Sequence, residues 1–452
     1  MKPSQHNTSP SWETTLAQVV DWSEHLVQFH QRIAARFARS EPRQRALAYL
    51  KGLLSPLERK TSWQLAEQAR EATPYGMQRL LHQAACDVEG LRDDVRSYAL
   101  EHLGSQNTIL ALDETSFPKH GRHSAGVKSQ WCGCTGQVQN CQVGVFLSLC
   151  TALGHTLIDR ELYVPADWLA DRPRCQTAAI PDTRHFQTKP ELAALMLSRF
   201  LRACPTLPVS WVLADSIYGS NPDLRAFLER RHLPYVLAVS CQEPVVLSLP
   251  DGSCRRVETG AVPLLLAASL LFQPLSMGDG SKGPRLDDWA RLPLLHQGRA
   301  DGQHFLLIRR CREDPSLLWF FLVLAPVDTP LSAMVTAWGA RWHIEEDFEA
   351  GKDLGLDQYQ VRSFTGWYRH VTFVLLALAF LRSLCVLSPT APLAQPAPEP
   401  LPLTPREIRH VLALLLWPAP SSPPFVLAWS LWRRRHQRRA RFFHTQRRAR
   451  PG

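Results

Sequence analysis

Two aspartates stand where a folded chain can expose functional groups. Asp113 ends the apolar run of "TILALDET", and Asp215 ends the apolar run of "PVSWVLADSIYG". Both runs have the length and composition of buried β-strands. Acids at the carboxyl ends of neighbouring strands meet at one edge of a sheet, where they repel each other unless a cation lies between them. Carboxylate oxygens favour Mg²⁺ or Mn²⁺ as that cation. The alternative is that the two aspartates only cap turns.

A third candidate acid, Glu345, lies in the acidic stretch "RWHIEEDFEAGK". On a helix, Arg341, Glu345, Phe348 and Lys352 cluster within about 60° of one another, so one face carries two cations, an acid and an aromatic ring. An ordinary ion pair between Arg341 and Glu345, worth a few tenths of a kcal/mol, is the simpler explanation, but it does not account for Lys352. The other acids of this stretch fall off that face and are expected to be solvated (Glu346, Asp347 and Glu349).

The pattern between these acids predicts a mixed α/β fold. From 107 to 240 the apolar spacing gives three strands, a helix, a strand, a helix and a strand, which implies a mixed sheet covered by helices. Thr188 is expected to cap the first of these helices, with Pro190 in its first turn. The segment "VTFVLLALAFL" reads as a buried helix, because it stops far short of the ~20 apolar residues that cross a bilayer.

We expect five segments along the chain. They are an N-terminal helical domain (1–105), the first part of the sheet-containing core (106–240), a β-rich insertion with Gly-, Pro- and Ser-rich turns (241–330), helices that return to the core (331–388), and a Pro-rich linker with a short helix and an Arg-rich tail (389–452).

Charge and cysteine content narrow the function class. The net charge is +10, but the final 21 residues hold nine arginines and no acid, so the rest of the chain carries only +1. Such a tail binds phosphate backbones without reading sequence, or alternatively is a disordered solubilising segment. Eleven cysteines without a secretory signal suit a reducing cytosol. The "CGC" at 132–134 has no second pair at zinc-site spacing, so a structural zinc ion is not expected there.

These features together resemble the DDE transposases of bacterial insertion sequences, in the branch with a Y-x2-R-x3-E-x6-K signature. Arg341, Glu345 and Lys352 fit that signature at every spacing, and Trp338 stands at the position of its tyrosine. Blocks such as "LALDETSFPKHGRHSAGV", "VLADSIYG" and "GLDQYQVRSFTGWYRH" extend the resemblance from about residue 30 to about 385. Glu114 follows Asp113 where the family leads us to expect a second aspartate.

The resemblance implies an RNase H-like catalytic core interrupted by a β-rich insertion before the catalytic glutamate. It implies two Mg²⁺ or Mn²⁺ ions held by three catalytic acids, which are Asp113, Asp215 and Glu345. It also implies DNA contacts near the cut, with phosphates gripped by Arg341 and Lys352 and an unpaired base stacked on Trp338, although core packing is an equal alternative for this tryptophan.

The resemblance further implies cut-and-paste transposition in the bacterial cytoplasm, at the nucleoid. The partners are double-stranded DNA, both terminal inverted repeats and target, and a second copy of the chain when two ends are synapsed; no membrane is involved. The N-terminal helices would recognise the repeats. Two alternatives stay open: a general nuclease on the same fold, and a non-catalytic repressor derived from a transposase.

Overall fold

The computed structural model describes residues 12–249, 251–266, 270–280, 283–387, 403–416 and 422–449. Its strands are β1 (Thr108–Pro118), β2 (Lys128–Cys132), β3 (Gln137–Cys150), β4 (His155–Tyr163), β5 (Val209–Ala214), β6 (Tyr235–Val239), β7 (Pro244–Ser248), β8 (Cys254–Glu258), β9 (Gln273–Gly280), β10 (Gly283–His296), β11 (Arg299–Arg310) and β12 (Leu318–Leu324). Ten of them form one sheet in the order β2-β3-β1-β5-β6-β12-β11-β10-β9, with β4 also paired to β3.

The helices are α1 (Trp12–Ile33), α2 (Ser40–Leu54), α3 (Ser62–Gln68), α4 (Tyr75–His82), α5 (Val88–Leu103), α6 (Ala166–Ala170), α7 (Arg172–Thr177), α8 (Lys189–Ala203), α9 (Ser216–Gly219), α10 (Pro222–Glu229), α11 (Val262–Leu265), α12 (Leu331–Gly339), α13 (Trp342–Asp353), α14 (Phe364–Leu387), α15 (Pro405–Leu416) and α16 (Pro423–Ala449). Thr188 caps α8 in a capping box with Glu191, and Pro190 lies in its first turn, as the sequence predicts.

The catalytic-core part of the sheet runs β4-β3-β1-β5-β6. β3 is antiparallel to both β1 and β4, whereas β5 is parallel to β1 and to β6. This order, with only the second strand reversed, is that of an RNase H-like core, and the predicted fold class is therefore confirmed. β3 is buried without interruption from Cys141 to Cys150, because helices cover both faces of the sheet.

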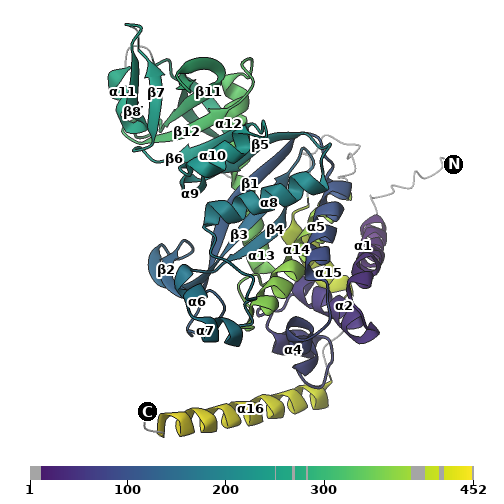
Figure 1. Cartoon of the computed structure of the whole chain (residues 1–452). Helices are drawn as coiled ribbons and strands as arrows, with labels where there is room; N and C mark the ends of the chain where they lie inside the picture. Colours follow the sequence, from purple (N-terminus) through teal and green to yellow (C-terminus); the bar gives the residue numbers. More distant parts are fainter. Residues whose placement is uncertain are drawn as a thin grey trace, which may run out of the picture.

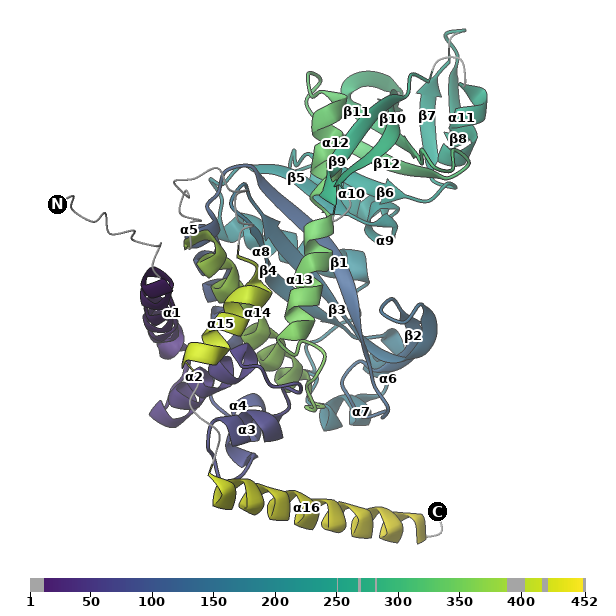
Figure 2. The ribbon, with the colours of Figure 1, turned by 180° about the vertical axis from the view of Figure 1, so that it is seen from behind.

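Two hydrophobic clusters hold the layers together. One face packs against α13, α14 and the N-terminal helices through residues such as Ala111, Phe146 and Phe373, and the other packs against α8 and α10 through residues such as Leu112 and Met196. Figures 1 and 2 show α14 running through the middle of the N-terminal helices, with α13 lying along the sheet. The N-terminal helices thus share one core with the sheet.

The region between β6 and α12 is rich in strands, and it extends the sheet. β12 pairs antiparallel with β6, and β11, β10 and β9 follow in turn, while β7 and β8 form a separate hairpin. This β-rich part lies at one end of the molecule (Figure 1). Because β12 joins β6 directly, the sheet of the core continues into the inserted strands.

Three expectations need adjustment. The apolar segment predicted to be too short for a bilayer belongs to α14, whose 24 residues are long and apolar enough to cross one. However, 78% of the most apolar stretch of this helix is buried inside the protein, so α14 is the central core helix. The Arg-rich tail is largely helical in α16, which projects away from the body (Figure 2). Most of the predicted Pro-rich linker lies outside the described residues.

Candidate active site

Asp113 and Asp215 lie side by side in the sheet. The parallel pairing of β1 with β5 ends at Leu112 opposite Ala214, so the next residue on each strand is one of the two aspartates. β5 stops there, and Asp215 caps α9 by accepting a hydrogen bond from the backbone N–H of Ile217 at 3.0 Å. The expectation that Asp113 ends its strand is wrong: β1 continues to Pro118, held by β3 alone. Asp113 therefore lies within β1, at the point where the pairing of β1 with β5 ends.

Arg341 connects the first aspartate with Glu345. Its guanidinium contacts Asp113 Oδ2 at 3.1 Å through Nη1 and pairs with Glu345 Oε1 through Nη2. Glu345 lies in the first turn of α13, and Arg341 is the residue that precedes this helix. The ion pair between Arg341 and Glu345 that the sequence suggested is thus present. Arg341 also pairs with Asp113, so it links the acid of the helix to the acid of the sheet.

The two aspartates hold protons more tightly than ordinary carboxyls do. Burial, followed by the charge of Asp215, raises the pKa of Asp113 to about 7, against the attraction of Arg341. Burial, followed by the charge of Glu114, raises the pKa of Asp215 to about 6. One guanidinium does not compensate this concentration of negative charge. Three carboxylates of this kind are a donor set for hard divalent cations, so the residues fit the metal that DDE-type chemistry requires.

Glu114 is part of the same cluster, and the sequence analysis assigned it no role. It points to the opposite face of β1 from Asp113, since side chains alternate along a strand. There Glu114 accepts hydrogen bonds from Lys189 Nζ at 2.6 Å and from the Tyr218 hydroxyl at 2.6 Å. From that face, the negative charge of Glu114 raises the pKa of Asp113 and of Asp215. The position of Glu114 next to Asp113 was the one hint in the sequence of a role at the site. Its partners could not be predicted, because they come from α8 and α9.

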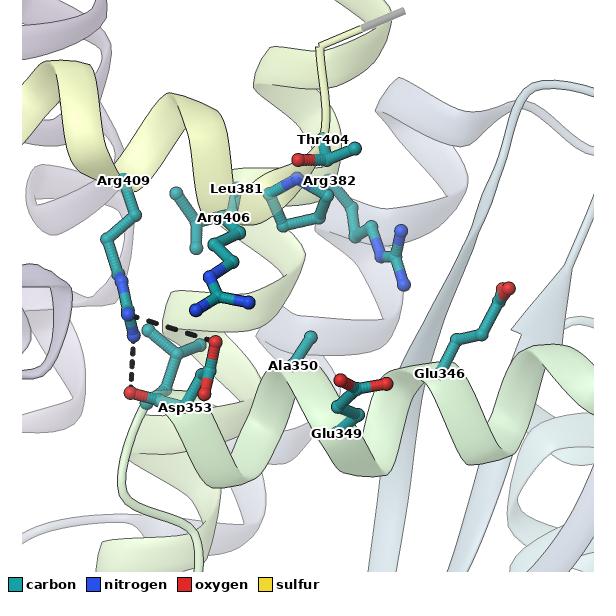
Figure 3. A pocket seen from close by; sticks show the side chains of 11 residues that line it. Glu346, Glu349, Ala350, Asp353, Leu381, Arg382, Thr404, Arg406 and Arg409 are labelled. Carbon is teal, nitrogen blue, oxygen red and sulfur yellow. Dashed lines mark hydrogen bonds and ion pairs between the residues drawn. The ribbon is translucent and has the colours of Figure 1, made fainter. Parts of the chain in front are cut away.

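The remaining acids of α13 face away from this site, and one of them is not solvated as predicted. Asp347 is completely buried, because Ser148, His155 and Arg382 surround its carboxylate. Glu346 contacts His155 and His343, and Glu349 is exposed. Figure 3 shows Glu346, Glu349 and Asp353 along the side of α13 that faces α15, around a pocket of about 330 Å³, with Arg409 paired to Asp353.

Comparison with known proteins finds a matching family. Residues 32–253 match the family described as DDE superfamily endonuclease, a segment that includes Asp113 and Asp215. The matched segment, which spans just under half of the chain, is similar to DDE superfamily endonucleases. Glu345 lies beyond the matched segment, so its assignment rests on the geometry above.

The chain is also similar to individual proteins. It is 30% identical over 191 residues to a probable transposase for insertion sequence element IS701 from Microchaete diplosiphon, a match that covers 42% of this chain and 46% of the relative. Among solved structures, it is similar to a piggyBac transposase synaptic complex with hairpin DNA (10% identity, TM-score 0.42, 91% of this chain and 80% of that one). It is also similar to endonuclease V from Streptomyces avermitilis (11% identity, TM-score 0.23, 60% of this chain and 93% of that one).

Beside the acids, the chain has a pocket of about 390 Å³ lined by three tryptophans and three arginines. Each arginine lies over one indole ring, at 6.0 Å for Arg285 on Trp342, 4.4 Å for Arg309 on Trp319 and 5.2 Å for Arg341 on Trp338. Trp338 packs on Phe321 with ring centroids 4.6 Å apart, so core packing accounts for part of its environment. Arg341 belongs to both the pocket and the acidic site.

Lys352 lies farther along α13 and away from this pocket. Its charge acts on the thiol of Cys134, which places it beside the hairpin of β2 and β3. Lys352 is partly exposed, and it lies almost two turns from Glu345 on the same face of the helix. The structure therefore separates the predicted phosphate contacts: Arg341 adjoins the acids, and Lys352 stands at the far end of the helix.

Proposed function

We propose that this protein is a transposase that cleaves DNA at the ends of an insertion sequence and joins those ends to target DNA. The observation that carries the proposal is the cluster of Asp113, Asp215 and Glu345 around Arg341, next to a pocket of alternating indole and guanidinium groups. The probable insertion-sequence transposase among the relatives supports the substrate class.

In this proposal the three acids hold divalent ions, Mg²⁺ or Mn²⁺. Such ions, when bound, activate an attacking water or DNA 3′-hydroxyl and neutralise charge on the phosphate. The contribution of the chain is to bring acids from two strands and one helix to one place and to keep Asp113 and Asp215 as paired oxygen donors. Two ions are expected because one would activate the nucleophile while the other would stabilise the leaving 3′-oxygen.

Arg341 has two roles in this scheme. Without cations it neutralises Asp113 and Glu345, which keeps repelling carboxylates together. Once divalent ions neutralise the acids, the guanidinium becomes available to hold a phosphate beside the scissile bond through paired N–H groups. Lys352 then binds the DNA backbone farther along α13.

The tryptophan pocket fits a base that has left the duplex near the cut. Indole rings stack on any base, and arginine guanidinium groups bind the adjoining phosphates, so a pocket that alternates the two suits single-stranded DNA. Trp319 and Trp342 are 39% and 48% exposed and can be reached by a base, whereas Trp338 forms the inner wall. A base held here is compatible with hairpin formation at the ends.

We further propose the roles of the other segments. The helices of 1–105 recognise the terminal repeats, the β-rich part within 241–330 contacts DNA flanking the cut, and two copies assemble when they synapse two ends. The arginines of α16 add affinity that is independent of sequence and sensitive to salt.

The test is cleavage of a labelled fragment that carries the flanking inverted repeat, with Mg²⁺ or Mn²⁺. We expect metal-dependent cutting at the repeat boundary, lost by at least ~100-fold in Glu345→Ala because a metal ligand is removed. Glu349→Ala is the matched control, since Glu349 is an exposed acid one turn along the same helix, and it should cut normally. Binding of the repeat without any cutting would favour a repressor, and cutting that ignores the repeat would favour a general nuclease.

A further inference from the structure

A second group of possible metal ligands consists of residues other than the three acids. Glu229 ends α10, His296 ends β10 and His304 lies in β11. One ligand atom from each of the three lies within 4.8 Å of the other two. The group therefore joins a helix that follows the core strand β5 to the hairpin of β10 and β11.

His304 is oriented as metal-binding histidines are. Its Nδ1 contacts Asp301 Oδ2 at 2.6 Å, and Asp301 is itself held by the backbone N–H groups of Gln303 and His304. A carboxylate that accepts the Nδ1 proton fixes the tautomer whose Nε2 carries a free lone pair. That Nε2 is buried and has no hydrogen-bond partner within the described part of the chain. A buried polar atom without a partner is costly, and an ion bound there would satisfy it.

The distances around His304 suit an ion better than a hydrogen bond. Its Nε2 lies 3.7 Å from Glu229 Oε1, which is too long for a hydrogen bond. Two atoms that each lie ~2.0–2.1 Å from a tetrahedral ion are separated by roughly 3.4 Å, close to the distance found here. The ring of His296 stacks on that of His304 with centroids 4.1 Å apart and planes 4° apart, so the second imidazole is close, and one of the two rings must turn for both nitrogens to face a shared ion.

The carboxylate and the surroundings complete the site. Glu229 Oε1 accepts a hydrogen bond from the Tyr235 hydroxyl at 3.1 Å, which orients it. A pocket of about 430 Å³, lined by all three residues and by His232, gives an ion and a water molecule access.

We propose that Glu229, His296 and His304 bind a borderline transition-metal ion, best represented by Zn²⁺, which fastens the β10–β11 hairpin to α10. Two imidazoles and one carboxylate are a zinc donor set, whereas the all-carboxylate site suits Mg²⁺ or Mn²⁺. The site is independent of the proposed DNA cleavage. A similar group, His155, His343 and Glu346, carries less weight, because Glu346 already lies within hydrogen-bond distance of both histidines.

The experiment measures Zn²⁺ binding by calorimetry to the full chain freed of metal by a chelator. To remove ions held by the three acids, the wild-type sequence is compared with an Asp113→Asn background. We expect one Zn²⁺ per chain to bind in the Asp113→Asn background, any further Zn²⁺ to bind only in the wild type, and that one site to be at least ~10-fold weaker when His304→Ala or His296→Ala is added to Asp113→Asn. His343→Ala is the matched control, and it should bind as the parent does.

Zn²⁺ should also stabilise the folded chain. At a free concentration 100 times its Kd, the ion raises the folding equilibrium constant about 100-fold, and this gain should vanish in His304→Ala. His304→Gln is a second variant in case His304→Ala does not fold. Unchanged binding in both the His304 and His296 variants, or binding lost in His343→Ala instead, would overturn the proposal. A loss of DNA cleavage in Asp113→Asn with Zn²⁺ binding intact separates this site from the catalytic one.

Discussion

Asp347 offers a demanding test of how the structure positions helix α13, which carries Glu345. It is buried completely on α13, two residues after Glu345, and its carboxylate accepts hydrogen bonds from Ser148 Oγ at 2.8 Å and from Arg382 Nη2 at 3.0 Å, with His155 Nδ1 at 2.9 Å. Replacing it in Asp347→Asn leaves the buried cations without their counter-charge. Loss of one partner from a buried ion pair costs about 3–5 kcal/mol, and we expect a destabilisation in that range.

Urea unfolding of Asp347→Asn beside Glu349→Gln measures this effect. Glu349 is an exposed acid on the same helix, so its neutralisation should change the free energy of unfolding by less than ~0.5 kcal/mol. Cleavage activity in Asp347→Asn should fall at temperatures where the chain remains folded, because α13 and Glu345 lose their anchor. A destabilisation under ~1 kcal/mol would refute the argument that this buried cluster holds the helix in place.

The pH dependence of the same variant supplies a second check. Burial alone would lower the pKa of His155, but the contacts with Asp347 and Glu346 outweigh it and raise the pKa above the ordinary value of 6.5. A raised histidine pKa stabilises the fold fully below pH 6.5, and that stability is lost as the pH rises through the folded value. The stability difference between wild type and Asp347→Asn should therefore shrink from pH 6 to pH 9. A difference that grows with pH would contradict this assignment.

Three further predictions concern the proposed site and the tail. The pKa values of about 7 for Asp113 and about 6 for Asp215 mean that protons compete with a metal ion for these carboxylates at low pH. The Mn²⁺ affinity measured by calorimetry should therefore fall roughly 20-fold from pH 8 to pH 6. An affinity that does not depend on pH would refute the raised pKa values. In Gly219→Ala the new Cβ would lie 1.9 Å from the backbone oxygen of Ala238, so the turn after Asp215 must shift. DNA cleavage should then fall at least ~10-fold. Normal cleavage would mean that the turn is not rigid. Deleting residues 423–452 should weaken binding to any DNA duplex without changing the cut position. The slope of log affinity against log salt concentration should become shallower by about 0.9 for each phosphate contact that is lost. An unchanged slope would assign the tail another role.

Local patterns in the sequence predicted local structure well. The cap at Thr188, the strands β1, β3, β4, β5 and β6 and the helix at 342–353 follow from periodicity and capping, which depend on residues close together in the chain. The strand β2 and the short helices α6, α7 and α9 were not predicted. The meeting of Asp113 and Asp215 was also predictable, because parallel strands place their carboxyl ends at one edge. The roles of these aspartates remain proposals.

Long-range packing explains what the pattern missed. The helical face of Arg341 and Glu345 was found correctly, but a single helix does not reveal what covers its other sides, and Asp347 was placed in solvent for that reason. Ser148 and Arg382, which bury it, are 199 and 35 residues away. The continuation of β1 past Asp113 likewise depends on β3, whose pairing the sequence of β1 alone does not specify.

The sequence by itself determined most of the elements and the family resemblance, and it nominated the three acids, because these depend on residue type and spacing along the chain. Only the tertiary structure decided how charge is distributed among them. It joined Arg341 to both Asp113 and Glu345, set Glu114 behind them, and brought Glu229 beside a histidine 75 residues later. These contacts arise from the closing of the sheet and the docking of helices upon it, since burial and the approach of distant charges fix the pKa and the partner of each group.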